Sequence, residues 1–149
     1  MNNSALIDTN ILVYSVHPGS PYHSKAKKLL EEALPTRRLA ISLQNITEFF
    51  AITTSKKYLS NPFSVDEAVA NLEIFAASCQ LILPSVRTKD TFFSLLRRAK
   101  VTGQDVHDVH LAATMLDNGI NTIYTADPKI FKALGVEAID PFEETVSSP

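Results

Sequence analysis

The sequence is poor in cysteine and glycine, and each shortage excludes a class of protein. Cys79 is the only cysteine in 149 residues, so a disulfide-stapled scaffold is excluded. The four glycines lie too far apart to form a GxGxxG or GxxxxGK[ST] phosphate loop, which argues against a nucleotide-binding module. The sequence also lacks a basic and apolar leader and any run of ~18 apolar residues. We therefore expect a cytoplasmic protein with no membrane span.

Charge of neither sign dominates the sequence. Lys and Arg number 14, Asp and Glu number 16, and the formal net charge is −2. A near-neutral total provides no general attraction to a polyanion. If four carboxylates gather in one pocket, however, the remainder of the chain is slightly positive. Clustered bases usually form a solvated helix face, but one or two clusters near a pocket would suffice to position a phosphate backbone.

Short apolar runs alternate with longer helical patterns along the chain. With 45% hydrophobic residues, the chain fits one domain over residues 1–149. Strands are predicted at 5–7, 39–42, 81–83, 122–125 and 136–139. Helices are predicted at 10–15, 22–34, 44–55, 64–78, 88–100, 105–116 and 128–134. Strands separated by helices predict a three-layer α/β/α sandwich around a parallel sheet of four to five short strands.

The stretch 4–14 places a carboxylate at the end of the first strand. Residues 5–7 are apolar at every position, as in a strand buried on both faces, and Asp8 follows directly. Open α/β sheets bind ligands at the carboxyl ends of their strands, so Asp8 is a candidate site residue. Aspartate is also a favoured N-cap residue, so Asp8 as a simple helix cap remains the alternative.

Three further acids are predicted at the same edge. Glu48 lies in the first turns after the second strand, Asp127 follows the fourth strand, and Asp108 joins them if its helix packs beside this edge. Carboxylates that converge without bases repel one another, and a divalent metal is the natural compensation. Ligands that are all oxygen favour Mg²⁺ or Mn²⁺ over zinc.

Each of these acids has a simpler alternative. Glu48 borders the apolar stripe of its helix, where solvent exposure is expected. Asp127 before Pro128 has the form of an ordinary helix start. Asp108 is harder to explain as an ordinary surface residue, because it shares a helix face with buried residues and a buried carboxylate needs a partner. Neighbouring His107 and His110 lack a third His or Cys nearby, so we expect hydrogen-bonding or surface roles for both.

Four segments together resemble the sequence blocks of the PIN-domain ribonucleases, and most closely the VapC-type toxins of toxin–antitoxin pairs. The segments are Leu6-Ile7-Asp8-Thr9-Asn10-Ile11-Leu12, the Gln44-to-Glu48 spacing, 108–114 (DVHLAAT) and 124–127 (YTAD). They occur in the family's order and span nearly the whole chain.

The resemblance implies an α/β/α sandwich with an acidic Mg²⁺ or Mn²⁺ site. It also implies endonucleolytic cleavage of RNA, a homodimer, and a small antitoxin that blocks the pocket. The catalytic and metal-binding acids that it carries over are Asp8, Glu48, Asp108 and Asp127. The polar residues expected to support them are Thr9, Asn10 and Thr125.

Asp105 is a further candidate ligand, because it precedes Asp108 by one helical turn. If the helix begins at or before Asp105, both carboxylates lie on one face and can reach the same metal. We expect Asp108 to be the ligand, because the segment 102–104 (TGQ) places Asp105 on a looser part of the chain.

The predicted chemistry requires no protein nucleophile. Carboxylates that hold one or two metals polarise the phosphate, activate water and stabilise the departing oxygen. Asp8 is the expected central ligand, Asp108 and Asp127 are direct or water-mediated ligands, and Glu48 is a ligand or a water-orienting base. A His-Asp phosphohydrolase is disfavoured because that fold is all-helical. A catalytically silent PIN-like domain that binds RNA or protein remains the main alternative.

Overall fold

The computed structural model describes residues 3–143 and contains one parallel sheet. The strands are β1 (Ala5–Ile7), β2 (Leu39–Ser42), β3 (Gln80–Ile82), β4 (Thr122–Tyr124) and β5 (Glu137–Ile139). Their order across the sheet is β3-β2-β1-β4-β5, so β1 lies at the centre. Its register with β4 pairs Ile7 with Tyr124, which brings the carboxyl ends of these two strands level.

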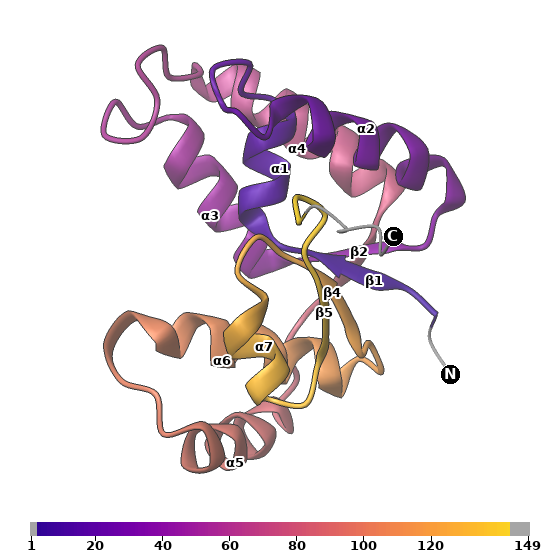
Figure 1. Ribbon diagram of the computed structural model, residues 1–149, viewed down its shortest axis with the longest axis vertical. Coiled ribbons are helices and arrows are strands. Elements are labelled where there is room, and N and C mark those ends of the chain that lie inside the picture. The colour runs from indigo at the N-terminus through magenta and orange to yellow at the C-terminus, as the bar shows by residue number, and fades with distance from the viewer. Residues whose placement is uncertain (1–2, 144–149) are drawn as a thin grey trace, which may run out of the picture.

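Helices cover both faces of the sheet (Figure 1). They are α1 (Thr9–Ser15), α2 (His23–Ala33), α3 (Leu43–Thr53), α4 (Val65–Ser78), α5 (Thr88–Ala99), α6 (Val106–Asp117) and α7 (Pro128–Ala133). Helices α1 to α4 lie on one side of the sheet and α5 to α7 on the other. Short 3₁₀ turns occupy Leu34–Thr36 and Gly103–Asp105. The predicted α/β/α sandwich is confirmed.

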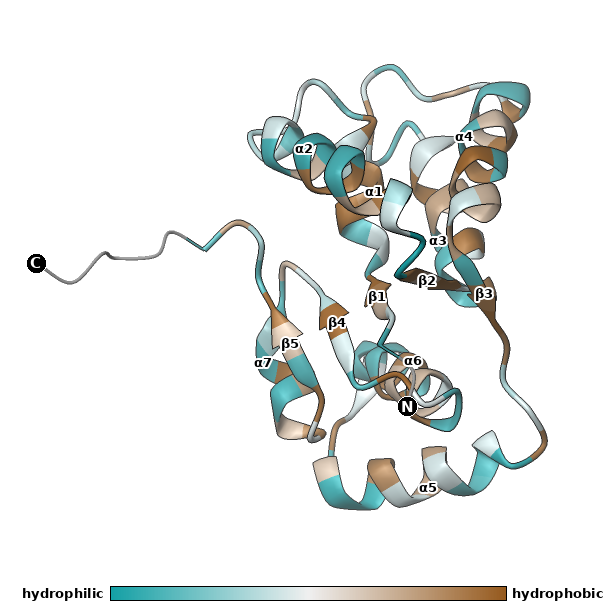
Figure 2. Cartoon of the chain, turned by 90° about the vertical axis from the view of Figure 1, so that its right-hand side faces the viewer, coloured by the Kyte–Doolittle hydropathy of each residue, from teal (hydrophilic) through white to brown (hydrophobic). Residues whose placement is uncertain are grey.

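The two halves of the core meet at the central strand β1. Leu6 packs in the cluster beneath α5 to α7, and its neighbour Ile7 packs in the cluster beneath α1 to α4. Both side chains have zero exposure, because successive residues of a strand point to opposite faces. Full burial of one such side chain contributes about 1.5–3 kcal/mol. Figure 2 shows the same division, with hydrophilic turns on the outer surfaces of the helices.

Most element boundaries differ from the sequence prediction by one or two residues, and two of these differences are instructive. Strand β3 occupies Gln80–Ile82 rather than 81–83, and it is an edge strand whose Leu81 is 47% exposed. An apolar run alone does not distinguish an edge strand from a central one. Helix α3 begins at Leu43 because Ser42 caps it, accepting a hydrogen bond from the Asn45 amide while the Asn45 side chain accepts from the Ser42 amide. None of the helices in residues 3–143 is long and apolar enough to cross a membrane.

Candidate active site

Asp8 is fixed between the ends of β1 and β4. It is the N-cap of α1, and its Oδ1 accepts a hydrogen bond of 2.8 Å from the backbone N–H of Thr9. Its Oδ2 accepts a second hydrogen bond, also 2.8 Å, from the hydroxyl of Thr125, which directly follows β4. The capping alternative is therefore real, but it uses only one carboxylate oxygen. The second oxygen is held across the sheet edge, as expected for a site residue.

Glu48 turns toward Asp8 rather than into solvent. The hydroxyl of Thr9 donates to Glu48 Oε2 at 2.8 Å, and the amide of Gln44 donates to Oε1 at 3.0 Å. Thr9 is itself buried, and its hydroxyl accepts a hydrogen bond of 3.0 Å from the Asn45 side chain. One threonine therefore supports both acids, through its backbone N–H to Asp8 and through its hydroxyl to Glu48.

Gln44 and Asn45 support the site through contacts that the sequence did not predict. Gln44 also donates to the backbone carbonyl of His107 at 2.9 Å, which ties the start of α3 to the start of α6. Its Oε1 is buried without a hydrogen-bond donor among residues 3–143. The Gln44-to-Glu48 spacing of four residues was a usable signal, because side chains at i and i+4 of a helix are neighbours.

Three other acids share an open depression. Asp105, Asp108 and Asp127 line a concavity of about 340 Å³ together with Lys129. Asp127 occupies the N-cap position of α7, but its carboxylate makes no capping hydrogen bond. Its backbone N–H instead donates to the Thr125 hydroxyl at 3.1 Å. Within the described part of the chain, none of these three carboxylates accepts a hydrogen bond or forms an ion pair.

Asp105 occupies the N-cap position of α6, at the end of the 3₁₀ turn that precedes this helix. Its backbone has φ −62° and ψ −16°, and the 3₁₀ turn that ends at Asp105 runs directly into α6 at Val106. Asp105 and Asp108 are therefore about 60° apart around the helix. Asp105 is exposed and Asp108 is half-buried, which keeps Asp108 closer to the core.

Asn10 does not support the acids as expected. Its side chain is exposed and makes no hydrogen bond with the described residues. It lines a second depression on the α1 side of the acids. Thr9 and Thr125 hydrogen-bond to the acids as expected. The supporting role expected of Asn10 is filled by Gln44, which donates to Glu48, and by Asn45, which donates to Thr9.

The five acids form one electrostatic cluster. The pKa of Asp108 is raised to about 6, first by burial and then by the charges of Asp8, Asp127, Glu48 and Asp105. Burial also raises the pKa of Asp8, against the lowering effect of its hydrogen bonds from Thr125 and Thr9, and the charges of Glu48 and Asp127 add to the rise. No described base forms an ion pair with any of these acids; the three ion pairs found lie elsewhere on the surface.

The oxygen atoms of this site are the ligands that a hard divalent cation prefers, although the side chains are not arranged around such an ion. All the available donors are oxygens, their charges are uncompensated, and the Gln44 amide oxygen beside them lacks a donor. As placed, no group of three His, Cys, Asp or Glu side chains in residues 3–143 is arranged to hold a metal ion. The imidazole of His110 instead packs edge-on against Phe92, with ring centroids 5.6 Å apart.

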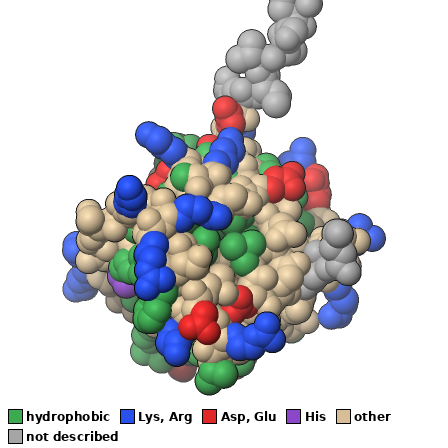
Figure 3. All heavy atoms as spheres, turned by 90° about the horizontal axis from the view of Figure 1, so that it is seen from below, with side chains coloured by type: hydrophobic (Ala, Val, Ile, Leu, Met, Phe, Trp, Pro, Cys, Tyr) green, Lys and Arg blue, Asp and Glu red, His purple; other side chains and the backbone are tan. Residues whose placement is uncertain are grey.

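Basic residues are spread over the face that carries α5 to α7. Figure 3 shows this face, with small groups of acidic side chains among Lys and Arg side chains. The bases on or beside these helices include Lys89, Arg97, Arg98, Lys100, Lys129 and Lys132. Arg98 is tied to the Leu134 carbonyl, and Lys129 lies in the acid-lined depression itself.

Comparison with known proteins agrees with this fold. The PIN domain model matches residues 5–136. Ribonuclease VapC48 of Mycobacterium tuberculosis is 33% identical over 147 residues, covering 93% of this chain and 98% of that protein.

Solved structures show the same fold. The M. tuberculosis toxin VapC20, described as cleaving the sarcin-ricin loop, superposes with a TM-score of 0.69 at 19% identity, over 89% of this chain and 96% of that one. A Klebsiella pneumoniae toxin-antitoxin complex contains a chain with a TM-score of 0.64 at 24% identity, over 95% of this chain and 100% of that one. By the domain match and the VapC48 relationship, the chain belongs to the PIN-domain family and, within it, to the VapC ribonucleases.

Proposed function

We propose that this protein is a metal-dependent endoribonuclease, which cleaves RNA phosphodiester bonds with water and serves as the toxin of a toxin–antitoxin pair. The observation that carries the proposal is the cluster of Asp8, Glu48, Asp105, Asp108 and Asp127, which has no basic partner among the described residues. The name of the VapC48 relative and the description of VapC20 support the substrate class.

We propose different roles for the carboxylates whose orientation is fixed by hydrogen bonds and for those that are free to turn. Asp8, held by Thr9 and Thr125, presents a carboxylate of set orientation. Asp108 and Asp127, with Asp105 beside them, are free to turn toward a Mg²⁺ or Mn²⁺ ion. A divalent cation bound there supplies positive charge to a phosphate and makes water more acidic.

Glu48 is proposed to orient the attacking water and accept its proton. Its two oxygens already accept hydrogen bonds from Thr9 and Gln44, so its orientation is fixed, and a carboxylate oxygen has further lone pairs for water. A general base must lie within hydrogen-bond reach of the proton that it removes, and a rigid carboxylate meets that requirement at low entropic cost.

Lys129 provides positive charge where a phosphate would arrive. It lies in the same depression as Asp105, Asp108 and Asp127 and forms no ion pair with the described residues. Phosphate contacts position a nucleic acid without reading its sequence, so Lys129 is proposed to hold the RNA backbone.

The partners follow from charge and exposed surface. Unpaired carboxylates in an open depression attract a basic segment, which is how we propose that a small antitoxin blocks the site. A homodimer is also proposed, because Leu83 and Val86 beside the edge strand are 50% and 90% exposed and a second copy would cover them.

Sequencing of cleaved RNA ends tests the function directly. The protein is incubated with total RNA and Mg²⁺ or Mn²⁺, with and without chelator, and both ends of each product are mapped. We expect cleavage at defined positions that stops in chelator and is lost in Asp8→Asn, while the surface control Asp90→Asn cleaves normally. Cleavage that survives both chelator and Asp8→Asn contradicts the mechanism. RNA binding without cleavage favours the silent-domain alternative.

A further inference from the structure

A second depression adjoins the acid cluster on the side of α1. It has a volume of about 440 Å³, and aromatic rings from three segments line it: Tyr14 from α1, Tyr22 from the loop before α2, and Tyr58 from the loop after α3. No described residue that lines it is acidic. An anionic ligand can therefore approach this depression more easily than it can approach the acids themselves.

The depression begins where the acid cluster ends. Asn10, which lines it, comes two residues after Asp8 on the first turn of α1. Ile52, which also lines it, is one helical turn beyond Glu48 on α3. Burial, the neighbouring Tyr22 and the Asp8 carboxylate all raise the pKa of Tyr14, which places its hydroxyl within electrostatic range of the site. The depression therefore adjoins the Asp8 and Glu48 side of the cluster, whereas Lys129 shares the other depression with Asp105, Asp108 and Asp127.

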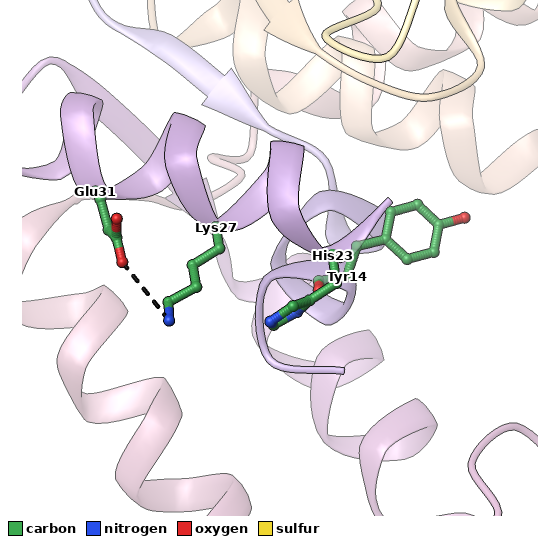
Figure 4. A network of polar contacts seen from close by, with 4 residues as sticks. All are labelled: Tyr14, His23, Lys27 and Glu31. Carbon is green, nitrogen blue, oxygen red and sulfur yellow. Dashed lines mark hydrogen bonds and ion pairs between the residues drawn. The ribbon is translucent and has the colours of Figure 1, made fainter. Parts of the chain in front are cut away.

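The tyrosine rings are held in position from outside the depression. The rings of Tyr14 and Tyr22 are 5.1 Å apart, and Phe142 packs against them at 5.6 Å and 4.8 Å. Nδ1 of His23 donates to the Tyr14 carbonyl at 2.8 Å, which fixes the end of α1. Figure 4 shows the Tyr14 ring pointing away from His23 and from the Lys27–Glu31 ion pair.

Two of the rings are open to a ligand. Tyr22 is 42% exposed and Tyr58 is 57% exposed. The Lys57 ammonium lies 5.3 Å from the centroid of the Tyr58 ring, so positive charge accompanies this aromatic surface. Exposed aromatic rings beside a cation form the surface on which single-stranded nucleic acid stacks its bases.

We propose that this depression is a subsite for one unpaired RNA base, adjacent to the phosphate that reaches the acid cluster. The base stacks on Tyr22 or Tyr58, and the free amide of Asn10 hydrogen-bonds to its edge. The inference rests on the proposed ribonuclease function and adds a means of substrate selection to it. Phosphate contacts fix the register of the strand, so a base next to the cleaved bond must lie close to the acids.

Steady-state kinetics on matched RNA strands test the subsite. The substrates are a short single-stranded RNA that the protein cleaves and the same strand with one abasic nucleotide placed on either side of the cleaved bond. For the wild type we expect the abasic nucleotide at one of these positions to raise KM about 5- to 50-fold with little change in kcat. Tyr22→Leu or Tyr58→Leu should show the raised KM on the intact strand and no further loss on the abasic one.

Conservative and remote variants sharpen the test. Tyr22→Phe and Tyr58→Phe keep the ring and should retain the wild-type KM. Phe93→Leu removes an equally exposed ring from α5 and should behave as the wild type. Equal KM values for intact and abasic strands, or leucine variants with unchanged KM, would overturn the subsite while leaving the nuclease function intact; the rings would then belong to a protein contact surface. Failure to cleave any RNA would overturn both proposals.

Discussion

The acid cluster has an anchored half and an open half. Asp8 and Glu48 each accept two hydrogen bonds, from Thr9, Thr125 and Gln44. Asp105, Asp108 and Asp127 line a depression, and their carboxylates accept none from the described residues. Asp8 follows the central strand β1 and Glu48 lies in the middle of α3, whereas the open acids lie at the starts of α6 and α7.

This difference separates structural from chemical roles. Replacing an anchored acid removes hydrogen bonds that also hold the fold, so its effects on stability and activity are mixed. Replacing an open acid relieves repulsion without breaking a contact. The open acids are therefore the better probes of chemistry, and the anchored acids are the better probes of preorganisation.

The largest expected effect is loss of cleavage in the open half. Asp108→Asn should reduce RNA cleavage on the order of 100-fold or more. The substitution removes the charge of a half-buried carboxylate that has no partner among the described residues, as expected of a metal ligand. Asp105→Asn should keep a measurable fraction, since Asp105 is exposed and lies further from the core. Asp117→Asn, at the other end of α6, is the control and should be unaffected. A more severe loss in Asp105→Asn than in Asp108→Asn would show that the ligands are assigned one turn too late.

A smaller effect is expected from loosening the anchored half. Thr125→Val removes the hydroxyl that holds Asp8 Oδ2 and should lower kcat about 10- to 100-fold, as for other groups that orient a ligand. Thr53→Val is the matched control, because among residues 3–143 that buried hydroxyl bonds only the Phe49 carbonyl. Measured melting temperatures separate misfolding from misorientation. Unchanged kcat in folded Thr125→Val would mean that the orientation of Asp8 is set by its helix cap alone.

A weaker effect, which depends on salt concentration, is expected from replacing Lys129 beside the open half. Lys129→Gln should raise KM for RNA about 5- to 10-fold and reduce the slope of log KM against log salt, because one phosphate contact is lost. Lys28→Gln is the control, since Lys28 lies on α2 and pairs with Glu32 of the same helix. Lys129 would have no role in RNA binding if both variants showed the same salt dependence.

The smallest effect concerns stability without metal. The pKa of Asp108 is raised from 3.8 to about 6, so the folded state binds this proton more tightly than the unfolded state does. The resulting stabilisation is complete below about pH 4 and is lost as pH rises through 6. In chelator at neutral pH, Asp108→Asn should therefore be more stable than wild type by roughly 1 kcal/mol, allowing for solvent screening. It should also lose part of the pH dependence between 4 and 6.

The anchored half provides the comparison for that measurement. Asp8→Asn also removes a charge whose pKa is raised, but it disturbs the hydrogen bond from Thr125, so its gain should be smaller. Thermal melts of both variants in chelator across pH 4 to 7 decide the matter. Strong destabilisation of both would contradict the repulsion argument and favour purely structural roles for these acids.

Local sequence determined much of the anchored half. The apolar run before Asp8 predicts a strand that ends at this carboxylate. The four-residue spacing predicts that Gln44 and Glu48 are neighbours on one helix face. Both predictions are possible because strand and helix periodicity are local properties. The same alternation of strands and helices determined the parallel sheet and the edge at which the acids lie. That topology also predicted Asp127 at this edge, and Asp108 if its helix packs beside it. The resemblance to PIN-domain sequences implies the same two acids, although Asp127 also has the form of an ordinary helix start.

Only the tertiary structure decided which polar groups hold the acids and which acids stay free. Thr125 reaches Asp8 because β4 pairs with β1 across 117 residues of sequence, and Gln44 reaches the start of α6 across 63. Asn10 faces away although it is adjacent to Thr9, because successive helix residues point about 100° apart. Strand periodicity and charge can be read from the chain itself, whereas a hydrogen bond between distant segments depends on the register and packing of the whole fold.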